Sequence, residues 1–469
     1  MRLRPTFTSQ SPTKRFSYCP GCLQKQLEID RLREEVARLK ARLRYQERSA
    51  QEGPFGASTP SSKIPIKTNT PPESQQRQGG AKAGHCGHGR RCIPHEEVTE
   101  HQSVAAPRKC PYCGGKLDPR GGKARTVIEV EPARKEVIRY ELQQCDCPHC
   151  KRVITAPTPG VFPKALFGNR VLAHVAIEHY VHGIPLAHLS RQLGLGQGSL
   201  WSALHQLAAR LAPALEKLIE EYRRAPVKHA DETGWRTDGR NGYAWLFRTE
   251  RVSLFRFRQS RSAQIPQEVL GTQRLRGTLV VDRYKGYNQA PCAIQYCYAH
   301  LLRDVQNLDK EFPQEAEVSR FVAALAPLLS QAMQLRAQKL ARAQFAQRAL
   351  ELKIDIKSRV HAEAKHPGIQ KIQNIFRKNS ARLYRWANQP AIPAENNSSE
   401  RELRRLVIAR KISFGSQSEK GARTRETLMS VLHTLDKRTD DLFAAFHRAL
   451  NALAQNVKLD PYKTLFDSG

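Results

Sequence analysis

The sequence has 469 residues, enough for about three domains at roughly 150 residues each. Its 77 basic residues outnumber its 44 acidic residues by 33, and this excess favours a polyanionic partner, because contacts with phosphates release condensed counterions. The alternatives are an anionic membrane surface and a charged surface that is only solvated. No apolar run reaches the roughly 18 residues of a membrane helix, and the opening MRLRPTFTSQ has no apolar signal-peptide core. We therefore expect a soluble cytoplasmic protein with no membrane partner.

Residues 23–47 carry apolar residues at alternating steps of three and four, the a and d pattern of a coiled coil. These positions are Ile29, Leu32, Val36, Leu39 and Leu43. Such a short helix is marginal by itself, so we expect it to pair with another copy of the chain; the alternative is a single amphipathic helix packed on its own protein. Residues 48–108 are rich in Gly, Pro, Ser, Gln and Lys and predict a basic flexible linker.

Residues 109–155 contain clustered cysteines, which indicate metal ligation in a chain without a secretory signal. Two C-x-x-C pairs flank this segment, and all four thiolates can bind one tetrahedral zinc ion. The four predicted zinc ligands are Cys110, Cys113, Cys147 and Cys150. Between the pairs, TVIEVEP and KEVIRYEL alternate apolar and polar residues as the two strands of a hairpin do. We therefore predict a zinc ribbon.

Other cysteines leave the ligand set open. Cys145 could replace Cys147 as a ligand. A further pair, Cys19 and Cys22, has no obvious partner pair: it could pair across a dimer, join Cys86 and Cys92 at a second site, or occur by chance.

Residues 166–222 have helical periodicity and the pattern of a helix-turn-helix. Leu189 belongs to the first helix, Gly194 makes the turn, and Leu200 anchors the second helix. The residues that the second helix would expose to a DNA groove are Gln197, Ser199, Ser202 and Gln206. The alternative is a structural helical hairpin.

Residues 226–308 change to β-branched and aromatic segments separated by turn residues, which predict five successive strands. The segments are APVKHADETGW, GYAWLFRT, VSLFRFRQ, GTLVVDRYKGY and AIQYCYAH. A helix at about 261–271 falls between the third and fourth strands. Three antiparallel strands, a helix and a buried apolar strand follow one another in this order in a ribonuclease H-like sheet.

Residues 309–392 are rich in Ala, Leu, Gln and Arg and predict a helical insertion into this core. A helix follows whose first turn contains Glu400, with Asn397 or Ser398 as its cap. The remaining segments are the second part of the core, 393–435, and a C-terminal helix and tail, 436–469. The predicted fold class is α/β multidomain: a ribonuclease H-like catalytic core with a helical insertion, preceded by a coiled coil, a zinc ribbon and a helix-turn-helix-like helical domain.

Three acids in this layout are suited to phosphodiester chemistry. Asp231 ends the first strand and Asp282 the fourth, and these strands are neighbours in a ribonuclease H-like sheet. Glu400 can join them from the helix after the insertion. Mg²⁺ (or Mn²⁺) prefers oxygen ligands, and two such ions about 3.5–4 Å apart stabilise the attacking and leaving oxygens. Any one of these acids could instead be a turn residue or a helix cap.

The neighbours of these acids have separate predicted roles. Glu232 should point to the face of its strand opposite Asp231, and Glu395 should lie in a loop before the helix. The basic residues expected to hold DNA phosphates are Arg401, Arg404, Arg405, Arg410 and Lys411. The alternative is that they form a solvated charged face.

Four segments resemble the transposases of the insertion sequence 66 family, and the resemblance covers most of the chain. They are ADETGWR at 230–236, VVDRYKGYN at 280–288, CYAHLLRDV at 297–305 and NNSSERELRRLVIARKISFGSQSEKGA at 396–422. By analogy, Asp231, Asp282 and Glu400 are the catalytic acids of a DDE enzyme. A C-x-x-H motif matches Cys297 and His300, and we interpret His300 as a residue that orients metal-bound water or a scissile phosphate, or as a packed core histidine.

The resemblance implies DNA strand cleavage and strand transfer at the inverted-repeat ends of the protein's own element. It further implies double-stranded DNA as element ends and target, a homo-oligomer that is at least a dimer, possible accessory proteins of the same element, and a place at the bacterial nucleoid. Two departures from the family pattern stand out. Glu395 occupies a position where we expect Asp, and Arg404-Arg405-Leu406 replaces the commoner Arg-Pro turn, which should make the helix more continuous.

Two other classes of protein compete with an active transposase. One is a catalytically silent DNA-binding regulator or domesticated relative, which would keep the zinc ribbon and the helical domain. The other is a nuclease or resolvase on the same sheet, which would not need the coiled coil, linker and helix-turn-helix together. The presence of all three acids favours the active enzyme.

Overall fold

The structure, a computed structural model, describes residues 20–52, 96, 136–142, 144–146, 153–155 and 158–467. Its contacts divide the chain into two compact units. The first comprises Met1–Ile64, Arg139–Arg191 and Leu195–Gly469, and the second comprises Pro65–Ile138 and Gln192–Gly194. Of the second unit, only residues 96, 136–138 and 192–194 are described. All the candidate catalytic residues belong to the first unit.

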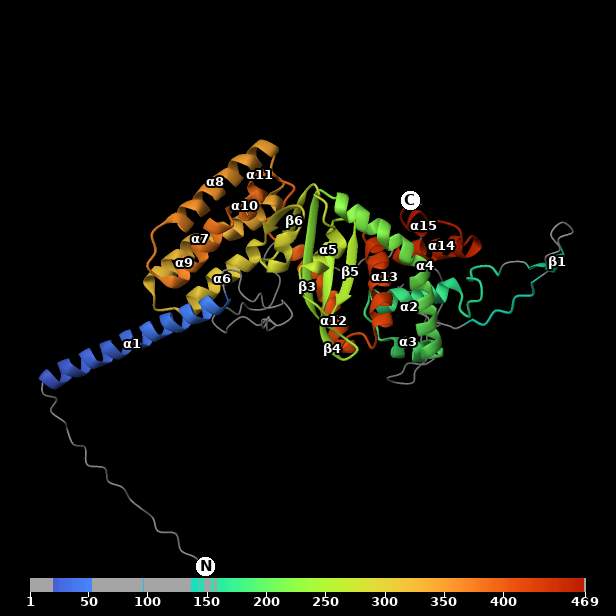
Figure 1. Cartoon of the computed structure of the whole chain (residues 1–469), viewed down its shortest axis with the longest axis horizontal. Helices are drawn as coiled ribbons and strands as arrows, with labels where there is room; N and C mark the ends of the chain where they lie inside the picture. Colours follow the sequence, from blue (N-terminus) through green and yellow to red (C-terminus); the bar gives the residue numbers. More distant parts are fainter. Residues whose placement is uncertain are drawn as a thin grey trace, which may run out of the picture. The chain divides into compact units, whose positions relative to one another are not determined.

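A five-stranded sheet with the order β5-β4-β3-β6-β7 lies at the centre of the first unit (Figure 1). Its strands are β3 (Val227–Thr237), β4 (Arg240–Arg248), β5 (Ser253–Arg258), β6 (Thr278–Val281) and β7 (Ala293–Tyr296). β3, β4 and β5 pair antiparallel, whereas β6 runs parallel to β3 and β7 parallel to β6. A helix, α5 (Gln264–Leu270), connects the antiparallel part to β6. The five predicted strands and the helix between the third and the fourth are therefore confirmed.

Two boundaries differ from the prediction. β3 does not end at Asp231 but continues to Thr237, because this stretch pairs antiparallel with β4. Asp231 therefore lies inside the strand, just beyond the end of the parallel pairing with β6. The segment predicted as the fifth strand is also shorter: β7 stops at Tyr296, and α6 (Tyr298–Glu311) begins two residues later, so that His300 lies in the first turn of a helix.

Helices cover both faces of the sheet and one of its edges. The long amphipathic α4 (Gln197–Arg224) packs Leu215, Leu218 and Tyr222 into the same core as the sheet residues Trp245 and Phe247. The edge strand β5 is covered by α13 (Glu419–Asp436). Side chains of α13 replace a neighbouring strand there: Thr434 accepts a hydrogen bond from the backbone of Ser253, and Ser430 from that of Phe255. This protects an edge that would otherwise expose unpaired amides.

The predicted helical insertion is present and extends the core away from the sheet (Figure 1). It consists of α7 (Ala316–Gln334), a short 3-10 helix η5 (Leu335–Gln338), α8 (Arg342–His361), α9 (Pro367–Lys378), α10 (Ser380–Leu383) and α11 (Arg385–Asn388). After it, α12 (Asn397–Ser413) returns to the sheet and contacts β3 and β4. The remaining helices are α2 (Asn169–Tyr180), α3 (Leu186–Leu193), α14 (Leu442–Gln455) and α15 (Pro461–Phe466).

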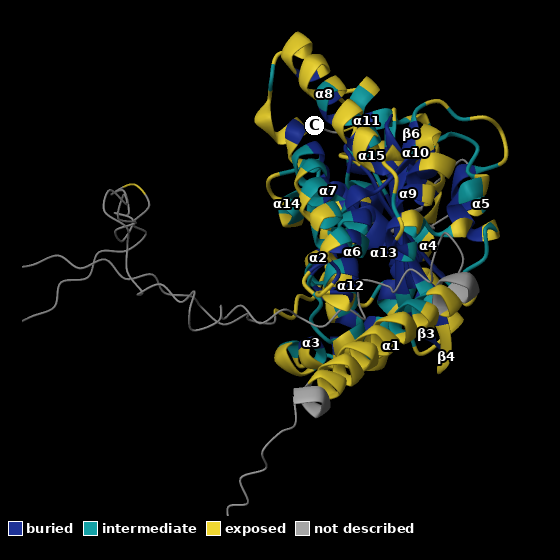
Figure 2. Ribbon diagram, turned by 90° about the vertical axis from the view of Figure 1, so that its left-hand side faces the viewer, coloured by how far each residue is buried: buried dark blue, intermediate teal, exposed yellow. Residues whose placement is uncertain are grey.

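The N-terminal helix α1 (Pro20–Glu52) includes the segment predicted as a coiled coil. Figure 2 shows most of its surface exposed. Its stripe residues are exposed by 43% (Ile29), 54% (Leu32), 48% (Val36), 52% (Leu39) and 55% (Leu43). Nearer its C-terminal end, Arg42 pairs with Glu315 at 3.0 Å. The helix thus exists as expected, and its pairing with a second copy stays a prediction.

The segment of the predicted zinc ribbon is described only in part. Residues 136–142, within KEVIRYEL, form no strand, contrary to the prediction. The hairpin that is present pairs β1 (Gln144–Asp146) with β2 (Val153–Thr155), on either side of the second cysteine pair. Cys110, Cys113, Cys147 and Cys150 lie outside the described residues, as do Cys19, Cys86 and Cys92. Within the described part of the chain, no helix combines the length and the apolar character needed to cross a membrane.

Candidate active site

Asp231 lies on β3 and Asp282 directly follows β6, at the same end of the parallel pairing between these two strands. In the pairing of β3 with β6, the last partners are His229 and Val280. Asp231 follows His229 by two positions, and Asp282 follows Val280 by two positions. Because side chains alternate along a strand, both carboxylates leave the same face of the sheet. Both are buried, with 9% and 6% of their surface exposed. The Oδ1 of Asp282 accepts a hydrogen bond of 2.9 Å from the backbone of Tyr284, which fixes the turn after β6.

Glu400 reaches the site from the first turn of α12, as predicted. The predicted caps Asn397 and Ser398 are wrong, however, because the helix begins at Asn397 itself and the carboxylate of Glu395 accepts the N–H of Asn397. This acceptor suits an N-terminus, whose free amides attract negative charge. The helix then continues without interruption to Ser413, as expected from the absence of the Arg-Pro turn.

The three acids share one electrostatic environment. The pKa of Asp231 is raised well above its usual value, first by burial and then by the negative charges of Glu232, Asp282 and Glu400. Glu400 Oε1 is buried and accepts no hydrogen bond among the described residues. The Nε2 atom of His300 lies 3.9 Å from this oxygen. The cluster is therefore rich in negative charge, and its acids accept hydrogen bonds only from backbone N–H groups among the described residues: Glu232 donates to Asp231 and Tyr284 donates to Asp282.

His300 faces this cluster from the first turn of α6. Its pKa is lowered, mainly by burial and also by Arg303 and Arg283, against the opposing effect of Asp282 and Glu400. The Nδ1 atom is buried without a hydrogen-bond partner in the described structure. Burial thus favours the neutral imidazole, with Nε2 directed towards Glu400 and Nδ1 without a partner among the described residues.

Glu232, by contrast, has its charge balanced. Arg261 donates to its Oε1 from Nε at 3.0 Å and from Nη2 at 2.5 Å, and the hydroxyl of Tyr287 donates to Oε2 at 2.5 Å. Its pKa rises to about 7, because burial and the charge of Asp282 outweigh the opposing effect of Arg261. His229 and Thr233, which share Asp231's face of β3, contact residues of α12 and the segment before it. Glu232 therefore points to the other face, as the sequence indicates.

A divalent cation fits the chemistry of these residues. Among the residues that the structure describes, no group of three or more His, Cys, Asp or Glu side chains stands ready to hold a metal ion. Asp231, Asp282 and Glu400 nevertheless offer the oxygen ligands that Mg²⁺ prefers. One of those oxygens has no donor, and the ionised form of Asp231 is disfavoured by its acidic neighbours. A bound cation would satisfy the first and relieve the second.

One face of α12 carries an excess of positive charge outside the carboxylate cluster. Its exposed residues are Asn397, Arg401, Arg404, Arg405, Ile408, Lys411 and Ile412, with no acid among them. Arg405 contacts Asp436 at 3.3 Å and keeps an exposed side chain. Arg410 differs from the other predicted phosphate ligands, because its Nη1 turns inward to the carbonyl of Gly234 at 2.5 Å and to Thr233 at 3.3 Å. Its guanidinium braces α12 against β3.

The other predicted DNA-binding residues lie at the exposed start of α4. Gln197, Ser199, Ser202 and Gln206 are all exposed. The last three line a hollow together with Lys164 and Arg210, so that positive charge lies beside them. One face of the second half of α4 packs into the core, so this surface lies on a helix that is anchored in the core.

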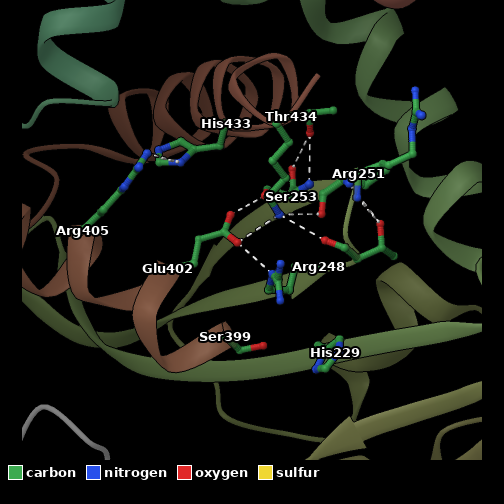
Figure 3. A network of polar contacts seen from close by, with 12 residues as sticks. His229, Arg248, Arg251, Ser253, Ser399, Glu402, Arg405, His433 and Thr434 are labelled. Atoms are coloured by element: carbon green, nitrogen blue, oxygen red, sulfur yellow. Dashed lines mark hydrogen bonds and ion pairs between the residues drawn. The ribbon is translucent and has the colours of Figure 1, made fainter. Parts of the chain in front are cut away.

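Sequence reasoning missed two residues that hold α12 in place. Asn396 bonds to β3 just before the helix begins, and Glu402 lies in a buried polar network with Arg248, Ser253 and Lys437 (Figure 3). The signal that could have revealed them is the placement of polar residues at positions that a helix packed on a sheet must bury. That face of α12 could not be identified before the sheet was known.

Comparisons with known proteins agree with the resemblance. A family model described as "Transposase IS66 family" matches residues 164–424, which is more than half of the chain. A second, described as "zinc-finger binding domain of transposase IS66", matches residues 107–151, which include the four cysteines predicted to bind zinc. The "Uncharacterized protein y4qI" of Sinorhizobium fredii (strain NBRC 101917 / NGR234) is 23% identical over 348 residues. That match covers 65% of this chain and 63% of the relative.

Proposed function

The chain belongs to the IS66 family of transposases, and from this premise we propose that it is an active DDE transposase with a ribonuclease H-like core. It would cleave and join DNA strands at the inverted-repeat ends of its own element. The observation that carries the proposal is the meeting of Asp231 on β3 with Asp282, directly after the adjacent parallel strand β6, and with Glu400 on α12, the helix that packs against β3.

In this proposal Asp231, Asp282 and Glu400 hold Mg²⁺ or Mn²⁺. Two such ions, when bound, supply an activated water or hydroxyl and stabilise the leaving oxygen. Ligation requires rearrangement of the side chains, because the described acids do not form a complete ligand group as they stand. The unpartnered oxygen of Glu400 is free to take part in that movement.

The remaining residues of the site bind and orient the DNA. His300, neutral and with Nδ1 unpartnered, is placed to hold a water or a phosphate oxygen beside Glu400. Arg401, Arg404 and Lys411 on the exposed face of α12 are placed to neutralise the phosphates that flank the scissile bond. The exposed residues at the start of α4 would contact a second stretch of the duplex, in the manner of a helix-turn-helix.

The experiment is a strand-transfer assay with the purified full chain. The substrate is a labelled duplex carrying the terminal inverted repeat found next to the gene, with a supercoiled plasmid as target and Mg²⁺ or Mn²⁺ as the ion. We expect nicking at the end of the repeat and labelled plasmid as the joined product. Stable, sequence-specific binding without nicking or joining would instead identify a catalytically silent regulator.

We further propose that Cys110, Cys113, Cys147 and Cys150 bind one structural zinc ion, as the matched zinc-finger domain suggests. Native mass spectrometry of the chain should show one zinc per chain. The double variant Cys110→Ser/Cys113→Ser should lose the zinc, and the first unfolding transition should move to lower temperature. The same metal content in the variant and in the unaltered chain would refute this ligand set.

A further inference from the structure

Asn396 occupies the position immediately before α12, where an Asn side chain usually caps its own helix by accepting a backbone N–H. Here the side chain makes no such bond. The cap is supplied by Glu395, whose carboxylate accepts the N–H of Asn397. Only 1% of the surface of Asn396 is exposed. A polar residue buried in this way and not used for capping must be satisfied elsewhere.

The side chain of Asn396 reaches across to β3. Its Nδ2 donates to the carbonyl of Ala230 at 2.9 Å, and its Oδ1 lies 2.8 Å from Nδ1 of His229. Both partners are within two residues of Asp231. Because a neutral His229 must donate through Nδ1 to this oxygen, donor and acceptor of the carboxamide are both used, and neither Asp nor Leu could satisfy both contacts.

The same residue is bonded to the two other elements of the site. Oδ1 accepts a second hydrogen bond, of 2.9 Å, from the hydroxyl of Ser399, the neighbour of Glu400. The backbone N–H of Asn396 points to Sγ of Cys297 at 3.1 Å, and Cys297 precedes the helix that carries His300. Cys297 in turn donates its N–H to the carbonyl of Val281, the residue before Asp282. Ser399 on α12 and His229 on β3 are both hydrogen-bonded to Oδ1 of Asn396, and Figure 3 shows these two side chains.

We propose that Asn396 is a positioning residue that holds the three carboxylate-bearing elements in the mutual arrangement needed to bind the divalent ion. The inference rests on the proposed function, since it concerns the same site. Asn396 itself touches neither the ion nor the DNA in this proposal. It acts through Ala230 and His229 on Asp231, through Ser399 on Glu400, and through Cys297 on the turn that carries Asp282. Residues of this kind, which orient metal ligands, typically change metal affinity by about 10–100-fold when they are replaced.

The test compares Asn396→Ala with Asn397→Ala in the full-length chain. Asn397 is the next residue in the sequence, is exposed, and makes no side-chain hydrogen bond among the described residues. Both changes are neutral, so the electrostatic attraction for the cation is the same in each. The measurement is Mn²⁺ binding followed by electron paramagnetic resonance, without DNA, together with thermal unfolding of each variant.

We expect Asn396→Ala to weaken Mn²⁺ binding by about 10–100-fold and Asn397→Ala to bind like the unaltered chain. Strand cleavage by Asn396→Ala should recover as the Mn²⁺ concentration is raised, because the loss lies in the requirement for metal. A role confined to stability would lower the unfolding temperature and leave the Mn²⁺ affinity of the folded variant unchanged, and that result would overturn the inference.

Ser399→Ala provides a milder variant that keeps the carboxamide of Asn396 and its bonds to β3. It should weaken Mn²⁺ binding in the same direction and by less. If Asn396→Ala does not fold, this variant decides: Mn²⁺ affinity equal to that of the unaltered chain counts against a positioning role. If the unaltered chain itself shows no saturable Mn²⁺ binding, the proposed function fails and the inference falls with it, whereas binding that is indifferent to Asn396 removes the inference only.

Discussion

Glu400 and Glu402 are two residues apart on α12, and their carboxylates have opposite surroundings. Glu402 accepts a hydrogen bond from Arg248 at 2.9 Å and is paired with Lys437 at 3.0 Å, and the hydroxyl of Ser253 donates to its other oxygen (Figure 3). Burial alone would raise its pKa, but Lys437, His433, Ser253 and Arg248 together lower it below the usual value. Glu400 has a buried oxygen with no donor among the described residues, and the Nε2 atom of His300, whose pKa is lowered mainly by burial, lies 3.9 Å away.

In the proposed function, this difference separates charge that stabilises the fold from charge that binds a metal ion. A buried carboxylate is costly unless it is paired and hydrogen-bonded. Glu402 meets that requirement within the protein, as Glu232 does through Arg261 and Tyr287. Glu400, with Asp231 beside it, does not. The buried charge at Glu400 therefore lacks a hydrogen-bonding partner among the residues that the structure describes, whereas the buried charge at Glu402, two residues later, is fully paired.

The largest effect on activity is expected for the substitution Glu400→Gln. The change removes a metal ligand in the proposed function, so cleavage of the labelled repeat end should fall by about a thousandfold or more, since bound metal contributes several kcal/mol to the transition state. DNA binding in a gel-shift assay should stay within error of the unaltered chain. The free energy of unfolding should stay equal or rise, because one of the negative charges near Asp231 is lost. Cleavage at the original rate would show that Glu400 is not a ligand.

Glu402→Gln should have the reverse profile. The variant leaves the buried charges of Lys437 and Arg248 without their partner, and breaking a buried ion pair in this way typically costs about 3–5 kcal/mol. The free energy of unfolding, measured by urea denaturation, should fall by that amount, while the variant that remains folded should still bind DNA. If Glu400→Gln and Glu402→Gln lowered stability equally, the contrast between the two regions would be false.

The part of this contrast that sequence could predict is set by local pattern. Alternating β-branched residues predicted the strands that carry Asp231 and Asp282, and the family motifs pointed to Glu400. The strand end at Asp231 was predicted wrongly, because local pattern does not reveal that residues beyond it pair with β4. Asn396 and Glu402 could not be assigned for the same reason: their partners His229 and Arg248 lie more than 150 positions earlier in the chain, and only the packed sheet brings them together.

The buried histidine His433 provides a test with a smaller, pH-dependent effect near the paired carboxylate of Glu402. His433 packs between α13 and the sheet, and its pKa is lowered to about 4, mainly by burial. A histidine whose folded pKa lies below its unfolded value stabilises the fold fully above pH 6.5 or so and loses this contribution as the pH falls towards about 4. Asp231, with a raised pKa, changes stability in the opposite sense. The measurement therefore compares the unaltered chain with His433→Gln at each pH.

Between pH 6.5 and 4.5 the stability advantage of the unaltered chain over His433→Gln should shrink by up to about 1.4 kcal/mol per pH unit. Urea denaturation of both proteins across this range gives the value. An advantage that is independent of pH would mean that His433 is protonated in the folded chain or accessible to solvent.

The smallest effect on the stability of the fold is expected for substitutions in α1. This helix also contains both partnered and unpartnered side chains, but here the side chains are apolar or aromatic. Tyr45, near the C-terminal end of the helix, packs edge-on against Phe312, whereas the apolar residues with heptad spacing, between Ile29 and Leu43, are exposed. Among the described residues of the single chain, no other side chains cover this exposed stripe, and we expect a second copy of the chain to cover it.

Burying a Leu at such an interface contributes about 1.5–3 kcal/mol, so Leu32→Ala/Leu39→Ala should raise the dissociation constant of the oligomer at least about tenfold. Sedimentation velocity measures it, with Lys40→Ala, outside the stripe, as the control. The unfolding temperature of the sheet region should not change, because both leucines are more than half exposed in one chain. If the chain sediments as a monomer with and without these changes, α1 packs on its own protein and does not pair with a second copy. The contrast between partnered and unpartnered groups would then hold only for the carboxylates of Glu402 and Glu400.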